Sequence, residues 1–303
     1  MRESLAALAR FADRLSPLVP ARTTIDWAQT VSAVWRSDAL GGALVPVAST
    51  VTTALTDLVA IDRQRDALVA NLRQFLAGFP ANNVLLTGSR GAGKSSLIQA
   101  LITEFHPDGL RLVQLGKTEL VRLPQVFEQV AAEPYRFLVF CDDLSFDGDD
   151  DGYKLLKSAL EGSVERRASN CLICATSNRR HLLPERRSDN LGTRIEDGEL
   201  HEAEAVEEKI SLSDRFGLWL TFYPMKQLDY LTTVRHWLRR LLADYDALEL
   251  LPDDLGDDRS QVLVESLAWA RARGNRSGRT AHYFARDWVG RRLLEADADT
   301  CAT

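Results

Sequence analysis

The sequence predicts an α/β protein in which a mostly buried parallel sheet is followed by a smaller, purely helical region. From about residue 57, short apolar runs typical of strands alternate with helical segments, the pattern of parallel strands joined by crossover helices. After Pro224 the strand-like runs stop and only helical segments follow. The length of 303 residues and the apolar content of 45% fit a globular chain of roughly two domains.

Residues 1–56 are expected to form an N-terminal helical region. Apolar residues recur at helical spacing in two stretches, Leu5, Leu8, Phe11 and Leu15, and then Trp27, Val31, Val34 and Trp35. Gly41, Gly42 and Pro46 separate the helices. The polar faces carry both charge signs, which favours packing on a neighbouring domain over binding to a membrane.

Five strands are expected in a domain that covers residues 57–224. They are Val84–Thr87, Leu110–Leu115, Phe137–Cys141, Leu172–Thr176 and Leu218–Tyr223. Most are continuous apolar runs, as in strands that are covered on both faces. Helices over residues 226–245, 259–273 and 279–295 would then form a C-terminal helical domain spanning residues 225–303.

Charge and composition exclude several broad classes of protein. The 37 basic and 43 acidic residues leave a net charge of -6, so non-specific nucleic-acid binding through overall charge is not expected. No stretch reaches the roughly 18 apolar residues of a membrane span, and the N-terminus lacks a secretory pattern. The four cysteines make no disulfide framework. We therefore expect a cytoplasmic protein without membrane association.

Residues Gly88–Ser95 carry the clearest chemical signal, because they match the phosphate-loop pattern GxxxxGK[ST] between an expected strand and an expected helix. Glycines let backbone N–H groups turn toward phosphate oxygens, Lys94 reaches the β- and γ-phosphates, and the Ser95 hydroxyl binds Mg²⁺. The expected nucleotide-binding residues here are Gly88, Ser89, Arg90, Gly91, Ala92, Gly93, Lys94, Ser95 and Ser96.

Two further polar groups follow expected strands. Asp142 and Asp143 come directly after an apolar strand about fifty residues beyond the phosphate loop. Asp142 is expected to hold Mg²⁺, and Asp143 to orient or deprotonate the attacking water. Asn178 ends the next strand and could place that water between Asp143 and the γ-phosphate. Together these residues predict binding of ATP with Mg²⁺.

Two other patterns carry weaker signals. The acidic run from Asp147 to Gly152 begins like a calcium-binding loop, but Ser158 stands where the bidentate glutamate is needed, which favours a solvated loop. Cys171 and Cys174 form a CxxC pair within an expected strand. Because side chains three residues apart on a strand point to opposite faces, a shared metal or disulfide is not expected there.

With these blocks in order, the sequence resembles the AAA+ ATPases, most closely a bacterial family described only as a domain of unknown function. The resemblance covers about residues 57–292, with residues 1–56 outside it. Its specific strings are Val84–Leu97, Tyr135–Phe146, Ala175–Glu185, Glu207–Leu220 and Arg276–Phe284. It implies a three-layer αβα P-loop NTPase sheet in 5-1-4-3-2 order, with a C-terminal helical lid over residues 225–303.

The resemblance also assigns roles to individual residues. It makes Gly88–Ser95 the Walker A loop, the two aspartates the Walker B pair and Asn178 the sensor-1 residue. Arg215 matches the arginine-finger position, which implies a homo-oligomer, and Arg279 matches the sensor-2 position on the lid. The segment expected to line the adenine pocket contains Leu58, Val59 and Ile61.

The expected activity is slow, Mg²⁺-dependent ATP hydrolysis that couples the nucleotide state, ATP or ADP, to the geometry of the lid and of neighbouring subunits. Slow turnover is expected because Asp143 is one methylene shorter than the glutamate commoner in the AAA+ superfamily, so its carboxylate needs a closer water or a shifted backbone. One alternative is a nucleic-acid-associated loader or regulator, suggested by eight arginines against Glu265 and Asp287 within residues 259–292. Another is an ATP-binding module that recruits a partner protein through residues 1–56 without significant hydrolysis.

Overall fold

The computed structural model describes residues 25–38, 41–48, 53–145, 156–160, 168–178 and 214–301. Within them, seven strands form one sheet in the order β2-β1-β4-β5-β6-β3-β7. The strands are β1 (Ser32–Arg36), β2 (Ala43–Val47), β3 (Val84–Gly88), β4 (Leu110–Leu115), β5 (Arg136–Cys141), β6 (Cys171–Ser177) and β7 (Leu218–Phe222). Every pairing is parallel except that of β1 with β2.

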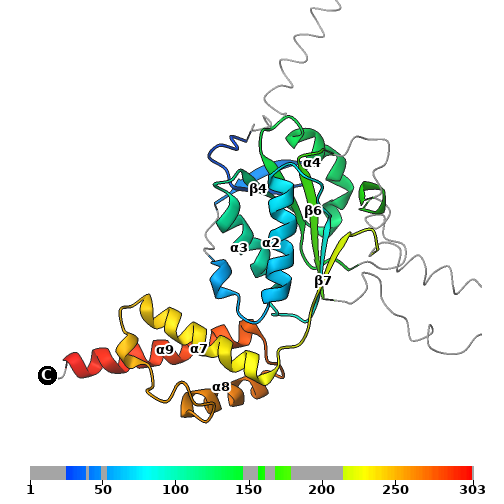
Figure 1. Ribbon diagram of the computed structural model, residues 1–303. Helices are drawn as coiled ribbons and strands as arrows, with labels where there is room; N and C mark the ends of the chain where they lie inside the picture. The colour runs from blue at the N-terminus through cyan, green and yellow to red at the C-terminus, as the bar shows by residue number, and fades with distance from the viewer. Residues whose placement is uncertain are drawn as a thin grey trace, which may run out of the picture.

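The predicted strand order is confirmed. In chain order the five expected strands are β3, β4, β5, β6 and β7, and they lie side by side as β7-β3-β6-β5-β4, which is 5-1-4-3-2. The predicted fold class is therefore also confirmed: a mixed α/β chain with a mostly parallel sheet and C-terminal helices, as Figure 1 shows.

Helices cover both faces of this sheet. On one face, α2 (Asp62–Leu76) and α3 (Lys94–Phe105) bury residues such as Leu72 and Leu101 against the sheet. On the other face, α4 (Leu123–Val130) and the helical residues 156–160 pack into a second cluster that contains Phe137 and Val139. Consecutive residues of β5 enter opposite clusters, since Leu138 and Phe140 belong to the first. This explains why the strand is apolar throughout.

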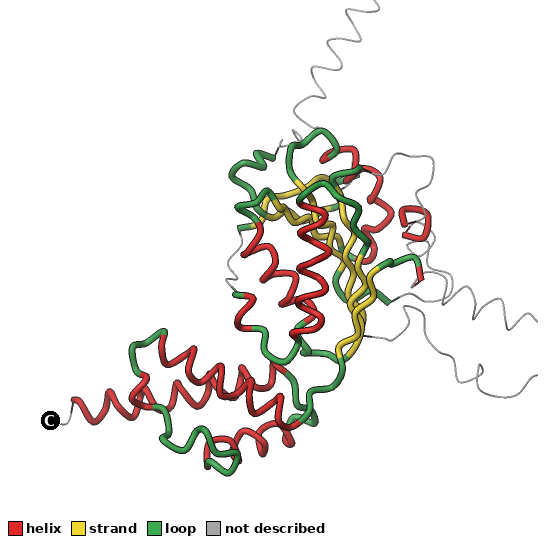
Figure 2. Tube along the Cα trace, viewed as in Figure 1, coloured by secondary structure: helices red, strands yellow, loops and turns green. Residues whose placement is uncertain are grey.

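Three helices follow the last strand and form a separate group, connected to the sheet through β7 (Figure 2). They are α7 (Gln227–Ala243), α8 (Gln261–Ala272) and α9 (Gly278–Cys301). Their own core includes Tyr230, Leu238 and Phe284, and the buried Tyr230 hydroxyl donates to the Ser266 carbonyl at 3.0 Å. We call these helices the lid.

No helix among the described residues is both long and apolar enough to cross a membrane.

The expectation of helices throughout residues 1–56 is wrong where the structure describes this region. β1 and β2 form an antiparallel hairpin, and β1 pairs in parallel with β4. The spacing of Val31, Val34 and Trp35 fits a helical stripe, yet on the strand Trp35 is buried and joins the core cluster of α4. Pairing with β4, about eighty residues away in the chain, stabilises the strand, and that contact is invisible to local periodicity.

The strand directions determine where the residues that follow the strands can lie close together. Because β3, β5, β6 and β7 run parallel, their carboxyl ends meet at one edge of the sheet. At that edge, Gly88 ends β3 with φ of 124°, and a Cβ there would lie 1.9 Å from the Phe222 carbonyl oxygen of β7. The first residue of the phosphate loop must therefore be glycine for β3 and β7 to pair so closely.

Candidate functional site

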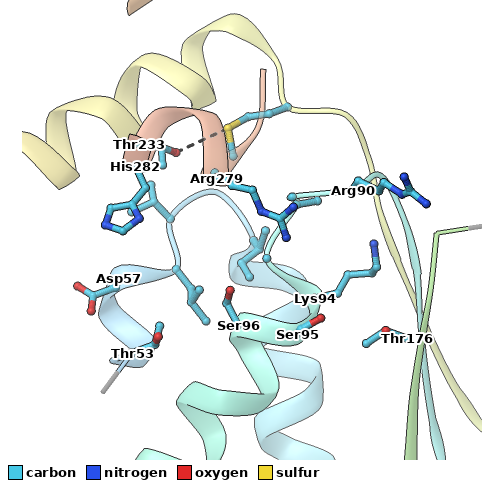
Figure 3. A pocket seen from close by; sticks show the side chains of 18 of the residues that line it. Thr53, Asp57, Arg90, Lys94, Ser95, Ser96, Thr176, Thr233, Arg279 and His282 are labelled. Carbon is cyan, nitrogen blue, oxygen red and sulfur yellow. Dashed lines mark hydrogen bonds between the residues drawn. The ribbon is translucent and has the colours of Figure 1, made fainter. Parts of the chain in front are cut away.

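A cavity of about 660 Å³ lies at this edge, where the phosphate loop, the ends of β5 and β6, the segment 53–61 and the lid meet. Figure 3 shows Lys94 and Thr176 on one side of it and Asp57 and His282 on the other, with Arg279 reaching in from the lid between them. Its size lies within the range of about 300–1,000 Å³ that is typical of small-molecule sites.

The phosphate loop has the backbone shape that an anion cradle requires. Gly91 and Gly93 have φ values of 75° and 96°, in the left-handed region that glycine adopts without strain. α3 then begins at Lys94, so its unpaired N–H groups and the positive end of its dipole lie at the cavity. All of the loop from Arg90 to Ser96 lines the cavity, and Gly88 and Ser89 lead into it.

The Lys94 side chain is buried, with 6% of its surface exposed. Its ammonium donates to the carbonyl oxygens of Gly88 at 2.8 Å and Ser89 at 2.9 Å, and to Oδ1 of Asn178 at 3.0 Å. Burial lowers the pKa of Lys94 from its ordinary value of 10.5, and the carboxylates that follow β5 oppose this shift. The positive charges of Arg279 and Arg90 also lower the pKa of Lys94.

Ser95 and Asp142 meet across the cavity. The Ser95 hydroxyl donates to Oδ1 of Asp142 at 2.8 Å, and the Asp142 side chain is exposed to the cavity. A hydroxyl and a carboxylate held together beside a phosphate cradle form an oxygen donor set, which suits Mg²⁺. These two side chains fit the magnesium site that the sequence predicts.

Asp143 and Asn178 also come together at this edge. The Asn178 amide donates to Oδ1 of Asp143 at 2.5 Å, so Asn178 bridges Asp143 and Lys94. Asp143 has φ of 52°, the left-handed region that aspartate tolerates better than most side chains. The backbone therefore leaves the extended geometry of β5 at Asp143.

Sequence reasoning missed Thr176, which contacts both acidic residues. Its hydroxyl donates to Oδ1 of Asp142 at 2.5 Å and accepts from the Asp143 N–H at 2.8 Å. A threonine two positions before a strand-ending asparagine, beside a strand that ends in two acids, is the signal that could have found it.

The lid reaches the phosphate loop directly. A Cβ added to Gly91 would lie 2.9 Å from the Ser277 hydroxyl oxygen, and the Arg279 N–H donates to the Gly91 carbonyl at 3.4 Å. The first turn of α9 therefore packs on the loop, and the Arg279 side chain lines the cavity (Figure 3). The cavity lining also contains the three residues expected at the adenine side, Leu58, Val59 and Ile61.

A second contact, between the lid and the segment that precedes α2, involves residues that the sequence did not single out. Asp57, only 7% exposed, is bonded to Nε2 of His236 at 3.1 Å and lies 3.8 Å from Nε of Arg240. The Trp237 and His282 rings pack with their centroids 4.3 Å apart, and both line the cavity. Burial lowers the pKa of His282, and this favours the neutral ring.

Arg215 lies away from these residues. It precedes β7, whereas the cavity lies beyond the carboxyl end of that strand, and it is not among the described residues that line the cavity. The structure therefore brings together every other expected site residue. Arg215, which precedes β7, lies instead toward the amino-terminal ends of the parallel strands.

The two weaker sequence patterns have different outcomes. The acidic run from Asp147 to Gly152 lies outside the described residues. Cys171 and Cys174 pack in the two different core clusters, so they point to opposite faces of the sheet as predicted. Among the described residues, no group of three or more His, Cys, Asp or Glu side chains is arranged to hold a metal ion.

Comparison with solved structures finds similar chains among AAA+ proteins. PCH-2 of C. elegans is 18% identical with a TM-score of 0.47, the match covering 75% of this chain and 62% of that one. A RuvB variant of Thermotoga maritima is 14% identical, TM-score 0.40, covering 77% and 71%. The Aeropyrum pernix ORC1 protein, solved in complex with DNA, is 15% identical, TM-score 0.45, covering 74% and 58%. At these values nothing about this chain's activity follows from the similarities.

A search of curated proteins finds no match. A family comparison does, and it extends further toward the N-terminus than the resemblance in the sequence suggested. The match runs from residue 28 to residue 292, so it includes the β1–β2 hairpin as well as the sheet and most of the lid. Residues 28–56 were expected to lie outside the family, and this expectation is wrong. The chain belongs to the family described as "Protein of unknown function (DUF815)".

Proposed function

We propose that this protein binds ATP with Mg²⁺ in the cavity between sheet and lid, hydrolyses it slowly, and uses nucleotide state to set the geometry of the lid and of neighbouring subunits. One observation carries the proposal: the Lys94 ammonium, the Ser95–Asp142 pair and the Asp143–Asn178 pair all converge on the phosphate loop. The lid packs on the same loop through Arg279. We propose residues 57–224 for the nucleotide-binding domain and 225–303 for the lid, and the pairing of β1 with β4 adds the β1–β2 hairpin, residues 32–47, to the nucleotide-binding domain.

Each residue has a distinct part in this proposal. The loop N–H groups and Lys94 bind the phosphates, and Leu58, Val59 and Ile61 contact the base. Bound Mg²⁺, held by Ser95 and Asp142, would neutralise charge on the phosphate oxygens. Asp143 accepts a proton from the attacking water, and Asn178 orients that water.

Arg279 and Arg215 account for the conformational part. Arg279 reaches the cavity from the first turn of α9, so a bound triphosphate attracts the lid toward the sheet domain. Arg215 precedes β7, toward the amino-terminal ends of the strands, and does not line the cavity of its own chain. We propose that it completes the cavity of a neighbouring copy in a homo-oligomer.

Phosphate release from MgATP tests the proposal. Lys94→Ala removes the phosphate-binding ammonium, and we expect hydrolysis to fall at least about 100-fold, since a charged contact to the reacting group is lost. Lys117→Ala is the matched control, because Lys117 lies in the 3-10 helix η3 (Lys117–Arg122) and does not line the cavity. Equal rates for wild type and Lys94→Ala contradict the enzymatic function.

The nucleic-acid alternative gains no support from the lid arginines. Arg291 pairs with Asp287 on its own helix at 3.1 Å, Arg292 likewise pairs with Glu295, and Arg279 faces the cavity. A stretch that looks strongly basic in the sequence therefore uses several of its charges locally. We favour ATP-dependent conformational coupling, and measurement of DNA binding at two salt concentrations would detect the alternative.

A further inference from the structure

We propose that Thr176 is a positioning residue that makes two consecutive acidic side chains, Asp142 and Asp143, face the same cavity. This inference rests on the proposed function, because it assigns Thr176 a part in the magnesium site and in the placement of the attacking water. It concerns contacts within the chain, however, and these can be tested without nucleotide.

Consecutive residues of a strand point to opposite faces of the sheet. The rule holds along β5, where Cys141 packs in one core cluster and Phe140 in the other. If the strand continued, Asp142 and Asp143 would also point apart. Both line the cavity, however, so the chain must leave the strand geometry between them. It does so at Asp143, whose φ of 52° departs from extended backbone.

Thr176 holds this departure in place. It lies on β6, beside β5, and is 1% exposed. Its hydroxyl accepts from the Asp143 N–H at 2.8 Å, and its carbonyl accepts from the Leu144 N–H at 2.7 Å. Two successive N–H groups are thus bonded to one residue of the neighbouring strand, and this fixes the turn that carries the Asp143 carboxylate toward Asn178.

The same hydroxyl orients the first acid. A hydroxyl has one proton, and because Thr176 accepts from an N–H, that proton is available to Oδ1 of Asp142, which lies 2.5 Å away. Oδ1 also accepts from Ser95, so two hydroxyl donors converge on one carboxylate oxygen. The carboxylate rotation is then set, and its other oxygen remains for further ligands.

Replacing Thr176 tests whether the hydroxyl does this. Thr176→Val keeps the shape and the strand preference of the side chain but loses the hydroxyl, whereas Thr176→Ser keeps the hydroxyl. Thr221→Val, on β7 of the same sheet, is the control for a threonine-to-valine change, because the Thr221 hydroxyl has a contact of only 3.4 Å with Thr87.

The first measurement uses the nucleotide-free protein. Hydrogen exchange of a peptide that spans residues 141–145 reports on the Asp143 amide. In Thr176→Val we expect this amide to exchange about 10-fold faster, as for the loss of one hydrogen bond, while Thr176→Ser and Thr221→Val remain close to wild type. Unchanged exchange in Thr176→Val overturns the inference, whatever the protein does with ATP.

The second measurement compares ATP affinity with and without Mg²⁺. We expect Thr176→Val to bind ATP without Mg²⁺ as tightly as wild type. The factor by which Mg²⁺ increases ATP affinity should fall roughly 10-fold, because the hydroxyl that orients Asp142 is gone. A merely structural defect would lower both affinities, and that result overturns the inference. If wild type shows no Mg²⁺-dependent ATP binding, the proposed function fails, and the exchange experiment alone decides whether Thr176 positions the acids.

Discussion

The Lys94 ammonium donates a hydrogen bond to the Asn178 amide oxygen, with 3.0 Å between Nζ and Oδ1. Its other two bonds go to the carbonyl oxygens of Gly88 and Ser89, so all three ammonium protons are used within the chain. Lys94 can therefore reach a phosphate only by giving up one of these bonds. Asn178 is the partner that links this exchange to Asp143, to which its amide nitrogen donates.

Substitutions at Asn178 should separate its two bonds. Asn178→Ala frees Lys94 from one partner, so we expect ATP affinity to stay the same or rise a few-fold, while hydrolysis falls at least about 10-fold because Asp143 loses its donor. Asn178→Asp places a carboxylate beside Lys94, which should hold the ammonium more firmly and weaken ATP binding. Titration with a fluorescent ATP analogue measures both affinities. Equal affinities for the two variants contradict this prediction.

Asp143→Asn should leave ATP bound but unreacted. The amide keeps the size of the side chain but cannot accept a proton from water, so we expect turnover to fall roughly 10²- to 10⁴-fold. Binding should change little, because the phosphates are held by the loop and Lys94. Single-turnover hydrolysis and equilibrium binding of the same preparation check this. A variant that hydrolyses ATP at the wild-type rate would remove Asp143 from the mechanism.

Arg215→Ala should abolish most hydrolysis while preserving ATP binding, since Arg215 lies away from its own cavity. The loss expected for a transition-state arginine supplied by a neighbour is about 10³-fold or more. Mixing Arg215→Ala with Asp143→Asn should restore part of the activity, because one variant supplies an intact cavity and the other an intact arginine.

Solution mass, measured with and without a non-hydrolysable ATP analogue, gives the control for the mixing experiment. We expect assembly to increase with the analogue. A chain that stays monomeric with nucleotide while retaining Arg215-dependent hydrolysis would rule out the intersubunit role.

Acid should destabilise the folded protein through His282. Burial lowers the pKa of His282 below its usual 6.5, with Arg286 acting in the same direction and Asp57 opposing it. The folded state thus prefers the neutral ring, and the stability this contributes is present above pH 6.5 and lost as pH falls through the lower folded-state pKa. His282→Gln cannot gain a proton, so its free energy of unfolding should fall less steeply in that window. Urea unfolding between pH 5 and 8 measures both curves, and parallel curves would exclude His282 as the cause.

Several parts of the fold follow from local patterns. The β3 strand, the glycine loop and α3 could be predicted because strand, loop and helix are adjacent in sequence and each has its own signal. The β1–β2 hairpin could not, since its apolar spacing fits helix and strand alike and β4 decides between them. Asp57 and His236 were missed for a related reason, because they are separated by 179 residues and meet only when the lid packs on the sheet domain.

The amino-acid sequence by itself determined which groups are present and the order of the strands that carry them: a lysine and a serine after one strand, two aspartates after another, an asparagine after a third. Their meeting at one edge follows from parallel pairing. Only the tertiary structure decided how these groups are oriented. The left-handed backbone at Asp143 and the Thr176 hydroxyl beside it depend on contacts between β5 and β6, because hydrogen-bond geometry across strands is absent from the sequence of either strand alone.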